Sequence, residues 1–121
     1  MFFIIYWIIS PIIWVIIPFA SLFNPKIRHH FIHYKKSIRY AKTKINQNKK
    51  NKKVVLFHAA STGEFEQLKP ILKLINREKY FILVSFSSPT AFIPENKTTL
   101  SDATCYHPFD LFWTAYLFFK K

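Results

Sequence analysis

The chain has 121 residues, half of them hydrophobic, and a formal net charge of +12. This length suits one small domain rather than two, and the hydrophobic content excludes an intrinsically disordered chain. The one cysteine, Cys105, excludes an intrachain disulfide and a thiolate metal site, and we expect it to be a small buried apolar residue.

The amino-terminal segment, residues 1–25, has no ionisable side chain and is predicted to be a membrane anchor. Its apolar run, Met1 to Phe23, would extend about 34 Å as a helix, enough to cross a hydrocarbon core of roughly 30 Å. Pro11 and Pro18 would kink this helix, which membrane helices tolerate. Because the positive charge follows the apolar run, we predict an uncleaved anchor with the rest of the chain in the cytoplasm. The pattern leaves open whether the anchor spans the bilayer or dips into one leaflet.

Residues 26–53 form a basic juxtamembrane segment with eleven Lys and Arg side chains and no acid. Three roles are open for it: contact with anionic lipid or phosphorylated glycolipid, nucleic-acid binding, and a solvated linker. A loosely amphipathic pattern favours the interfacial role. No nucleic-acid-binding fold or aromatic platform is present, so we expect no nucleic-acid partner. The apolar members of the pattern are Phe31, Ile32, Tyr34, Ile38, Tyr40 and Ile45.

From residue 54 onward the pattern is β-α-β-α-β, which is typical of an α/β fold. The strands are short continuous apolar runs, as expected for a parallel sheet covered on both faces and joined by right-handed crossovers. Pro70 inside the first helix predicts a kink or a late helical start, and residues 91–102 are read as a poorly defined helix or loop. The predicted strands are Val54–His58, Phe81–Phe86 and Thr104–Tyr106, and the predicted helices are Glu64–Asn76 and Leu111–Phe119.

The only glycine, Gly63, lies in the turn between the first strand and the first helix of this unit. Such a turn places Glu64 at the carboxyl edge of the sheet, where open α/β folds bind ligands. A glycine is expected where the backbone must turn or approach a ligand closely. The plainer interpretation is that Glu64 is a first-turn acid favoured by the helix dipole, with Ser61 and Thr62 as capping residues of a Ser-x-x-Glu box. A second polar turn, Ser-Ser-Pro-Thr at 87–90, follows the next strand in register.

Other patterns that would indicate catalysis or metal binding are weak. His29, His30 and His33 lie close together, but no acidic or thiolate residue accompanies them, so we expect no metal site there. His58 ends a predicted strand and is read as a hydrogen-bonded core histidine. The chain has no convincing Ser/His/Asp spacing and no glycine-rich phosphate loop.

The motif at 58–67, His-Ala-Ala-Ser-Thr-Gly-Glu-Phe-Glu-Gln, followed by Pro-Ile-Leu at 70–72, resembles the amino-terminal domain of the 3-deoxy-D-manno-octulosonic acid (Kdo) transferases. Residues 82–90 resemble that family's second strand and its Ser/Thr-Pro turn. Residues 106–110, Tyr-His-Pro-Phe-Asp, resemble its Tyr-x-Pro-x-Asp block. An apolar anchor and a basic stretch also precede the catalytic region of that family.

The resemblance implies a GT-B type glycosyltransferase with two Rossmann-like domains and an active site in the cleft between them. Such an enzyme transfers Kdo from CMP-Kdo to a hydroxyl of the lipid A precursor, lipid IVA, in lipopolysaccharide biosynthesis, with no metal or other cofactor. Glu64 matches the family's catalytic carboxylate and would be the general base. The substrate-binding residues implied by the match are Ser61, Thr62, Gly63, Ser88 and Thr90.

The sequence departs from the family pattern in three respects. Thr62 stands where Val is usual, and Ala91 stands where Gly is frequent. The resemblance extends only over the first part of the family's length, so residues 54–121 are expected to be a partial acceptor-side domain without the carboxyl-terminal donor domain.

The expected partners are therefore CMP-Kdo, the lipid A precursor, an anionic membrane surface and a separately encoded carboxyl-terminal domain, at the cytoplasmic face of the inner membrane. The alternative is a membrane-anchored remnant or glycolipid-binding module without turnover. A third interpretation is a small basic membrane protein in which Glu64 only begins a helix.

Overall fold

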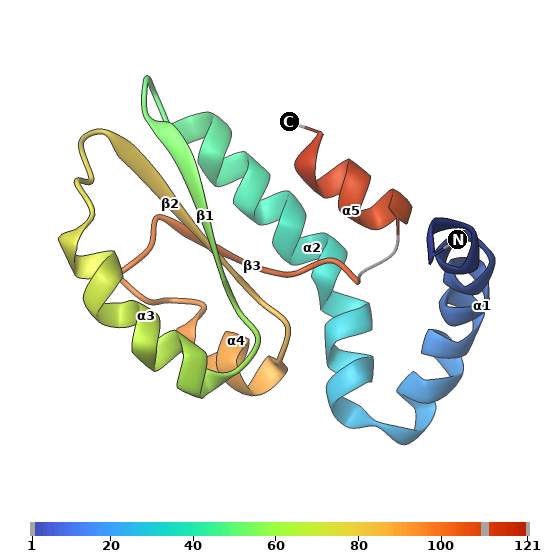
Figure 1. Ribbon diagram of the computed structural model, residues 1–121. Coiled ribbons are helices and arrows are strands. Elements are labelled where there is room, and N and C mark those ends of the chain that lie inside the picture. Colours follow the sequence, from blue (N-terminus) through green and yellow to red (C-terminus); the bar gives the residue numbers. More distant parts are fainter. Residues whose placement is uncertain (1, 110–111, 121) are drawn as a thin grey trace.

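The computed structural model describes residues 2–109 and 112–120, and that part of the chain contains five helices and three strands (Figure 1). The predicted β-α-β-α-β order from residue 54 onward is confirmed. In chain order the elements are α1 (Phe2–Phe23), α2 (Pro25–Asn48), β1 (Lys53–Ala59), α3 (Thr62–Leu74), β2 (Tyr80–Phe86), α4 (Pro89–Glu95), β3 (Ala103–Tyr106) and α5 (Phe112–Phe119).

The three strands form one parallel sheet in the order β1-β2-β3. His58 of β1 pairs with Ser85 of β2, and Ser85 pairs in turn with Cys105 of β3. All three strands therefore end at the same edge. The mixed α/β fold with a parallel sheet is as predicted, and each strand lies within one residue of its expected bounds, because a continuous apolar run bounded by polar turns is a strong strand signal.

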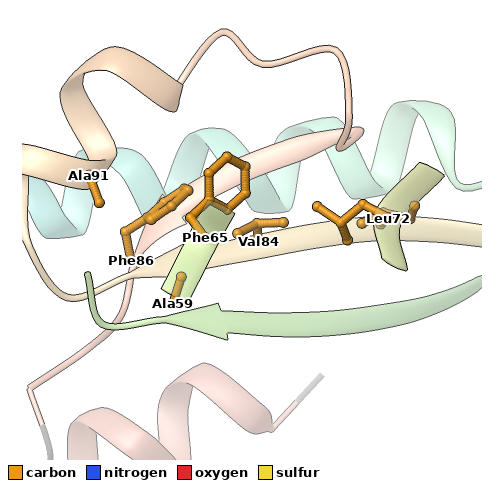
Figure 2. Packing of buried hydrophobic residues seen from close by; sticks show 7 residues of the cluster. Ala59, Phe65, Leu72, Val84, Phe86 and Ala91 are labelled. Atoms are coloured by element: carbon orange, nitrogen blue, oxygen red, sulfur yellow. The ribbon is translucent and has the colours of Figure 1, made fainter. Parts of the chain in front are cut away.

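One face of the sheet is covered by α3 and α4. Figure 2 shows side chains of these helices packed on residues of β1 and β2. The rings of Phe65 on α3 and Phe86 on β2 meet edge to face, with centroids 5.1 Å apart. The fully buried members of this cluster are Ala59, Phe65, Leu72, Ile82, Val84, Phe86 and Ala91.

The opposite face of the sheet is covered by α2, which packs mainly on β3. Ala41 contributes to a second core cluster with Cys105 and the neighbouring strand residues, and Phe118 of α5 packs against it. The Ser37 hydroxyl accepts a hydrogen bond from the backbone N–H of Tyr106 at 2.9 Å. Residues 25–48 are thus a helix docked on the sheet, so of the three roles left open for residues 26–53 that of a solvated linker is wrong for this stretch. The buried stripe of α2 is His30, Tyr34, Ser37 and Ala41.

The apolar residues of the amphipathic pattern expected for residues 26–53 lie only partly on the buried face of α2. Tyr34 is buried, and Ile38 and Ile45 pack against the second cluster. Ile32 and Tyr40, by contrast, are 61% and 55% exposed. The helix therefore presents a mixed face of polar, small and apolar residues to the sheet, and it leaves Ile32 and Tyr40 exposed.

Two helical bounds differ from expectation for local reasons. α3 begins at Thr62, not at Glu64 or later, because Ser61 caps it. Of the two alternatives that Pro70 suggested, a kink or a late start, the late start is therefore wrong, and this proline lies inside the helix. Part of the segment that was read as poorly defined is the short helix α4, which Ser88 caps and whose first residue is Pro89.

The first helix, α1, runs alongside the amino-terminal half of α2 (Figure 1). Its small residues Ser10 and Ser21 are buried, whereas Ile8, Val15 and Phe19 are exposed. Within the described residues, Ile4–Phe23 is the one helix whose length and composition would allow it to cross a membrane, with a mean hydropathy of 2.0. The predicted apolar helix is present, and most of its surface is apolar and open.

Cys105 gives a direct test of the packing between α2 and the sheet. Its side chain is fully buried, and this burial raises the pKa of the thiol to about 12. Because the thiolate is the reactive form, alkylation of the native protein near pH 8 should be at least about a hundredfold slower than in guanidinium chloride. The measurement is the rate of iodoacetamide labelling by mass spectrometry. A Thr99→Cys, Cys105→Ser double variant, with an exposed thiol, should react at the unfolded rate in both conditions. Fast labelling of native Cys105 would show that α2 does not stay docked.

Candidate active site

The carboxyl ends of the three parallel strands bring three turns to one edge of the sheet. Residues 60–64 follow β1, residues 87–90 follow β2, and residues 107–109 follow β3. Backbone hydrogen bonds extend the sheet into these turns, from the N–H of Ser87 to the carbonyl of Ala59 at 3.3 Å and from the N–H of His107 to the carbonyl of Phe86 at 2.8 Å. The site predicted at this edge therefore has a defined backbone frame.

Glu64 belongs to the capping arrangement of α3. The Ser61 hydroxyl accepts a hydrogen bond from the N–H of Glu64 at 3.3 Å, and Glu64 Oε2 accepts one from the N–H of Ala60 at 2.7 Å. This is a capping box shifted by one residue, since the acid reaches the amide before the cap rather than that of the cap itself. The carboxylate is exposed, and its second oxygen, Oε1, has no hydrogen-bond partner among the described residues. One oxygen thus orients the group while the other is left without a partner among the described residues.

Gly63 is not required by the backbone of this turn. It has no positive φ, and it lies in the first turn of α3. An added Cβ would meet only the Ser61 Oγ, at 3.9 Å. The expectation that the chain must turn through glycine here is therefore wrong. What the glycine provides is an unobstructed surface beside Glu64.

The turn after β2 contacts the turn that bears Glu64. The Thr62 hydroxyl donates to the carbonyl of Thr90 at 3.5 Å, a long contact. The hydroxyls of Ser88 and Thr90 lie 2.6 Å apart, and Ser88 also accepts from the N–H of Thr90. The structure therefore brings Ser88 and Thr90 together with the turn at 61–64, as predicted from the parallel pattern.

A network of serines and histidines joins the three strand ends and was only partly anticipated. His58 Nδ1 lies 3.0 Å from the Ser85 hydroxyl, which lies 3.2 Å from His107 Nδ1. His58 Nε2 is 3.3 Å from the Ser87 hydroxyl. His58 is hydrogen-bonded as expected, but it is exposed and so is not a core residue.

Next to these turns lies a cavity of about 470 Å³. It is bounded on one side by the start of α2 and on the other by the turns after the three strands. Ala60 and Ser88 contribute to it, whereas Glu64 is not a lining residue, although its carboxylate accepts a hydrogen bond from Ala60. The lining residues are Asn24, Lys26, Ile27, His30, Ala60, Ser87, Ser88, Pro89, His107, Pro108 and Phe109.

His30 is the residue of this site that sequence reasoning missed. It was considered only with His29 and His33 as a metal cluster, yet it is buried and contacts the backbone of two site turns. The signal that would have found it is its spacing with Tyr34, at i+4, on one face of a helix. No group of three or more His, Cys, Asp or Glu side chains able to hold a metal ion occurs within the part of the chain that the structure describes.

Comparison with known proteins identifies the family of the chain. The sequence model of the 3-deoxy-D-manno-octulosonic-acid transferase (Kdotransferase) family matches residues 26–121. The chain is thus a sugar transferase by class, and it belongs to the Kdo transferase family through that family's amino-terminal domain. The match includes α2, which is consistent with the docking of this helix on the sheet. No curated protein and no solved structure matches the chain.

The capping role of Ser61 predicts a modest loss of stability in Ser61→Ala. Removing a cap hydroxyl costs about 1 kcal/mol, so the free energy of unfolding should fall by that amount. Urea denaturation followed by circular dichroism measures it. Thr99→Ala, at an exposed turn residue, should change stability by less than about 0.5 kcal/mol. Equal stability of Ser61→Ala and the wild type would mean that the cap does not hold α3.

Proposed function

We propose that the chain is the acceptor-side, Rossmann-like half of a GT-B type glycosyltransferase. Its reaction is the transfer of Kdo from CMP-Kdo to the lipid A precursor, lipid IVA, in lipopolysaccharide biosynthesis. The observation that carries the proposal is the position of Glu64. Its carboxylate lies in the first turn after β1, at the carboxyl edge of a parallel sheet, and is exposed, with only one oxygen held by the N–H of Ala60.

In this proposal Glu64 is the general base. Its free oxygen accepts the proton of the acceptor hydroxyl as that hydroxyl oxygen forms a bond to the anomeric carbon of Kdo. The bond between the anomeric carbon and the CMP oxygen breaks, and CMP leaves with the electron pair. The hydrogen bond from Ala60 keeps the carboxylate directed out of the turn, which reduces the freedom that must be lost before reaction.

The remaining residues of the two turns hold the substrate in this proposal. Ser61, Thr62 and Gly63 shape the turn, and the open surface at Gly63 lets a sugar approach the backbone closely. Ser88 and Thr90 line the same side of the cleft from the neighbouring turn. No metal takes part in the step.

The donor site belongs to a carboxyl-terminal domain that faces this edge of the sheet. The motif residues present in this chain form one wall of a cleft, and CMP-Kdo needs a second wall that recognises the nucleotide. We therefore expect transfer to require that domain. Without it the chain would be a membrane-anchored remnant that retains the motif without turnover.

The acceptor is a membrane glycolipid, and we propose that residues 1–25 anchor the chain at the cytoplasmic face of the inner membrane. The exposed apolar side of α1 would lie in one leaflet, because α1 packs along α2. A spanning orientation would carry the exposed cations Arg28, Lys35 and Lys36 of α2 to hydrocarbon depth, which is costly. Lying in the interface, the same cations meet anionic headgroups, at about 1 kcal/mol per charge.

The catalytic proposal is tested by transfer from CMP-Kdo to lipid IVA in membranes that contain this chain and the carboxyl-terminal domain. Glu64→Gln should lower kcat/KM by about 10²- to 10⁴-fold, since it removes the base. The matched control is Glu66→Gln on the same helix turn, where the exposed carboxylate only pairs with Lys69, and its transfer should stay near the wild-type rate. Full activity of Glu64→Gln would leave Glu64 as a capping residue only. No transfer by the wild type with the second domain present would identify a non-catalytic remnant.

The orientation of α1 is tested by tryptophan quenching in vesicles that contain lipids brominated at different depths. Trp7 and Trp14 are about 10 Å apart along a helix axis, and each is measured alone, with the other and Trp113 changed to Phe. An in-plane α1 predicts that both are quenched best by the same shallow bromine position. Maximal quenching at two clearly different depths would show instead that α1 spans the bilayer.

A further inference from the structure

His30 connects α2 to two of the three turns at the carboxyl edge. Its ring lies 2.8 Å from the carbonyl oxygen of Ser87 through Nδ1 and 2.8 Å from the carbonyl oxygen of His107 through Nε2. Only 7% of the residue is exposed. A single buried side chain thus bridges the backbone after β2 and the backbone after β3.

Aromatic packing holds the ring in this orientation. The His30 ring is stacked on Tyr106, with centroids 4.6 Å apart and an interplanar angle of 27°, and on Phe109, at 4.5 Å and 29°. Desolvation by burial lowers the pKa of His30, and its hydrogen bonds to the two carbonyl groups oppose this shift. The neutral ring has one N–H, so it donates to one of the two carbonyls at a time, whereas the protonated ring donates to both.

The two bridged turns are those that complete the candidate active site. Ser87 directly precedes Ser88 in the turn whose Thr90 carbonyl accepts from Thr62, next to Glu64. His107 lies in the turn after β3, and its side chain contacts the hydroxyl of Ser85 in β2. Displacement of the turn after β2 would therefore move the neighbours of the turn that carries the carboxylate.

We propose that His30 is a positioning residue that ties the turn after β2 and the turn after β3 to α2. It does not touch the reacting atoms. Its effect on transfer rests on the proposed function, but its effect on the two turns does not. The neighbouring histidine His33 provides a comparison, because it is exposed and hydrogen-bonds only to the carbonyl of His29 in its own helix.

Two amide variants separate the two tethers. The side-chain nitrogen of Asn can take the place of Nδ1, so His30→Asn keeps a donor for the Ser87 carbonyl. That of Gln can take the place of Nε2, so His30→Gln keeps a donor for the His107 carbonyl. His30→Phe keeps a ring between Tyr106 and Phe109 and removes both donors. His33→Gln is the control.

The experiment is hydrogen–deuterium exchange of the full chain in nanodiscs, followed in peptides that cover residues 87–92 and 106–109. His30→Phe should speed exchange at least about tenfold in both peptides, because both turns lose their tether. His30→Asn should speed it only in 106–109, His30→Gln only in 87–92, and His33→Gln in neither. Unchanged exchange in His30→Phe, or identical patterns in the Asn and Gln variants, would overturn the proposal. If His30→Phe does not fold, the Asn and Gln pair still decides it.

Transfer kinetics, measured with the carboxyl-terminal domain, separate this inference from the proposed function. Loosening of the turns should lower kcat/KM about 10- to 100-fold in His30→Phe. His30→Asn should recover part of this loss, because it keeps the hydrogen bond to the turn next to Glu64. The expected exchange pattern with no transfer by the wild type would refute the proposed function and leave the tether intact. Wild-type transfer with an unchanged exchange pattern in His30→Phe would refute the role of His30 and support the proposed function.

Discussion

A parallel sheet has to be covered on both faces, and in this chain that requirement determines where the helices lie. All of β2 except its first residue is buried, and so is every residue of β3. The connections α3 and α4 cover one face, so the other needs an element from outside the β-α-β-α-β unit. That element is α2, which comes from the basic segment before β1. Without α2, Phe81 and Cys105 would face water.

The strands and the site turns could be predicted from the sequence because each depends on local signals. Apolar runs such as that of β2 end in polar turns, and parallel pairing then brings those turns to one edge. The resemblance to the Kdo transferases through residues 58–67 was confirmed by the family match. Ser61 was also predicted correctly as a cap, because the spacing to Glu64 is local.

The docking of α2 could not be predicted in the same way, because only part of its buried stripe is apolar. His30 and Ser37 are stabilised there by hydrogen bonds to residues that lie 57 or more positions later in the chain, Ser87, His107 and Tyr106. A hydrophobicity pattern contains no information about such partners, and the dense positive charge of the segment indicates a solvated face instead. Gly63 illustrates the opposite error: a rare residue suggested a turn that requires glycine, where the structure has an ordinary helical turn.

The capping and catalytic interpretations of Glu64 do not compete in this geometry. Capping uses one carboxylate oxygen, through the amide of Ala60, and leaves the other exposed. A group whose position is set by its own helix start needs little further support from the fold. This explains how a carboxylate in a solvent-facing turn can have a defined direction even though its side chain is not buried.

α2 is a single uninterrupted helix of 24 residues, and at 1.5 Å per residue it is about 36 Å long. Its first half contacts the apolar helix α1, and it also contacts the sheet and, through His30, the turns at the carboxyl edge. The distance between Glu64 and α1 is therefore set by a helix that contacts both α1 and the sheet, and not by a flexible linker. In the proposed enzyme the carboxylate would therefore act at one fixed distance from the bilayer, and glycolipids would be selected in part by how far each headgroup raises its hydroxyl above the lipid surface.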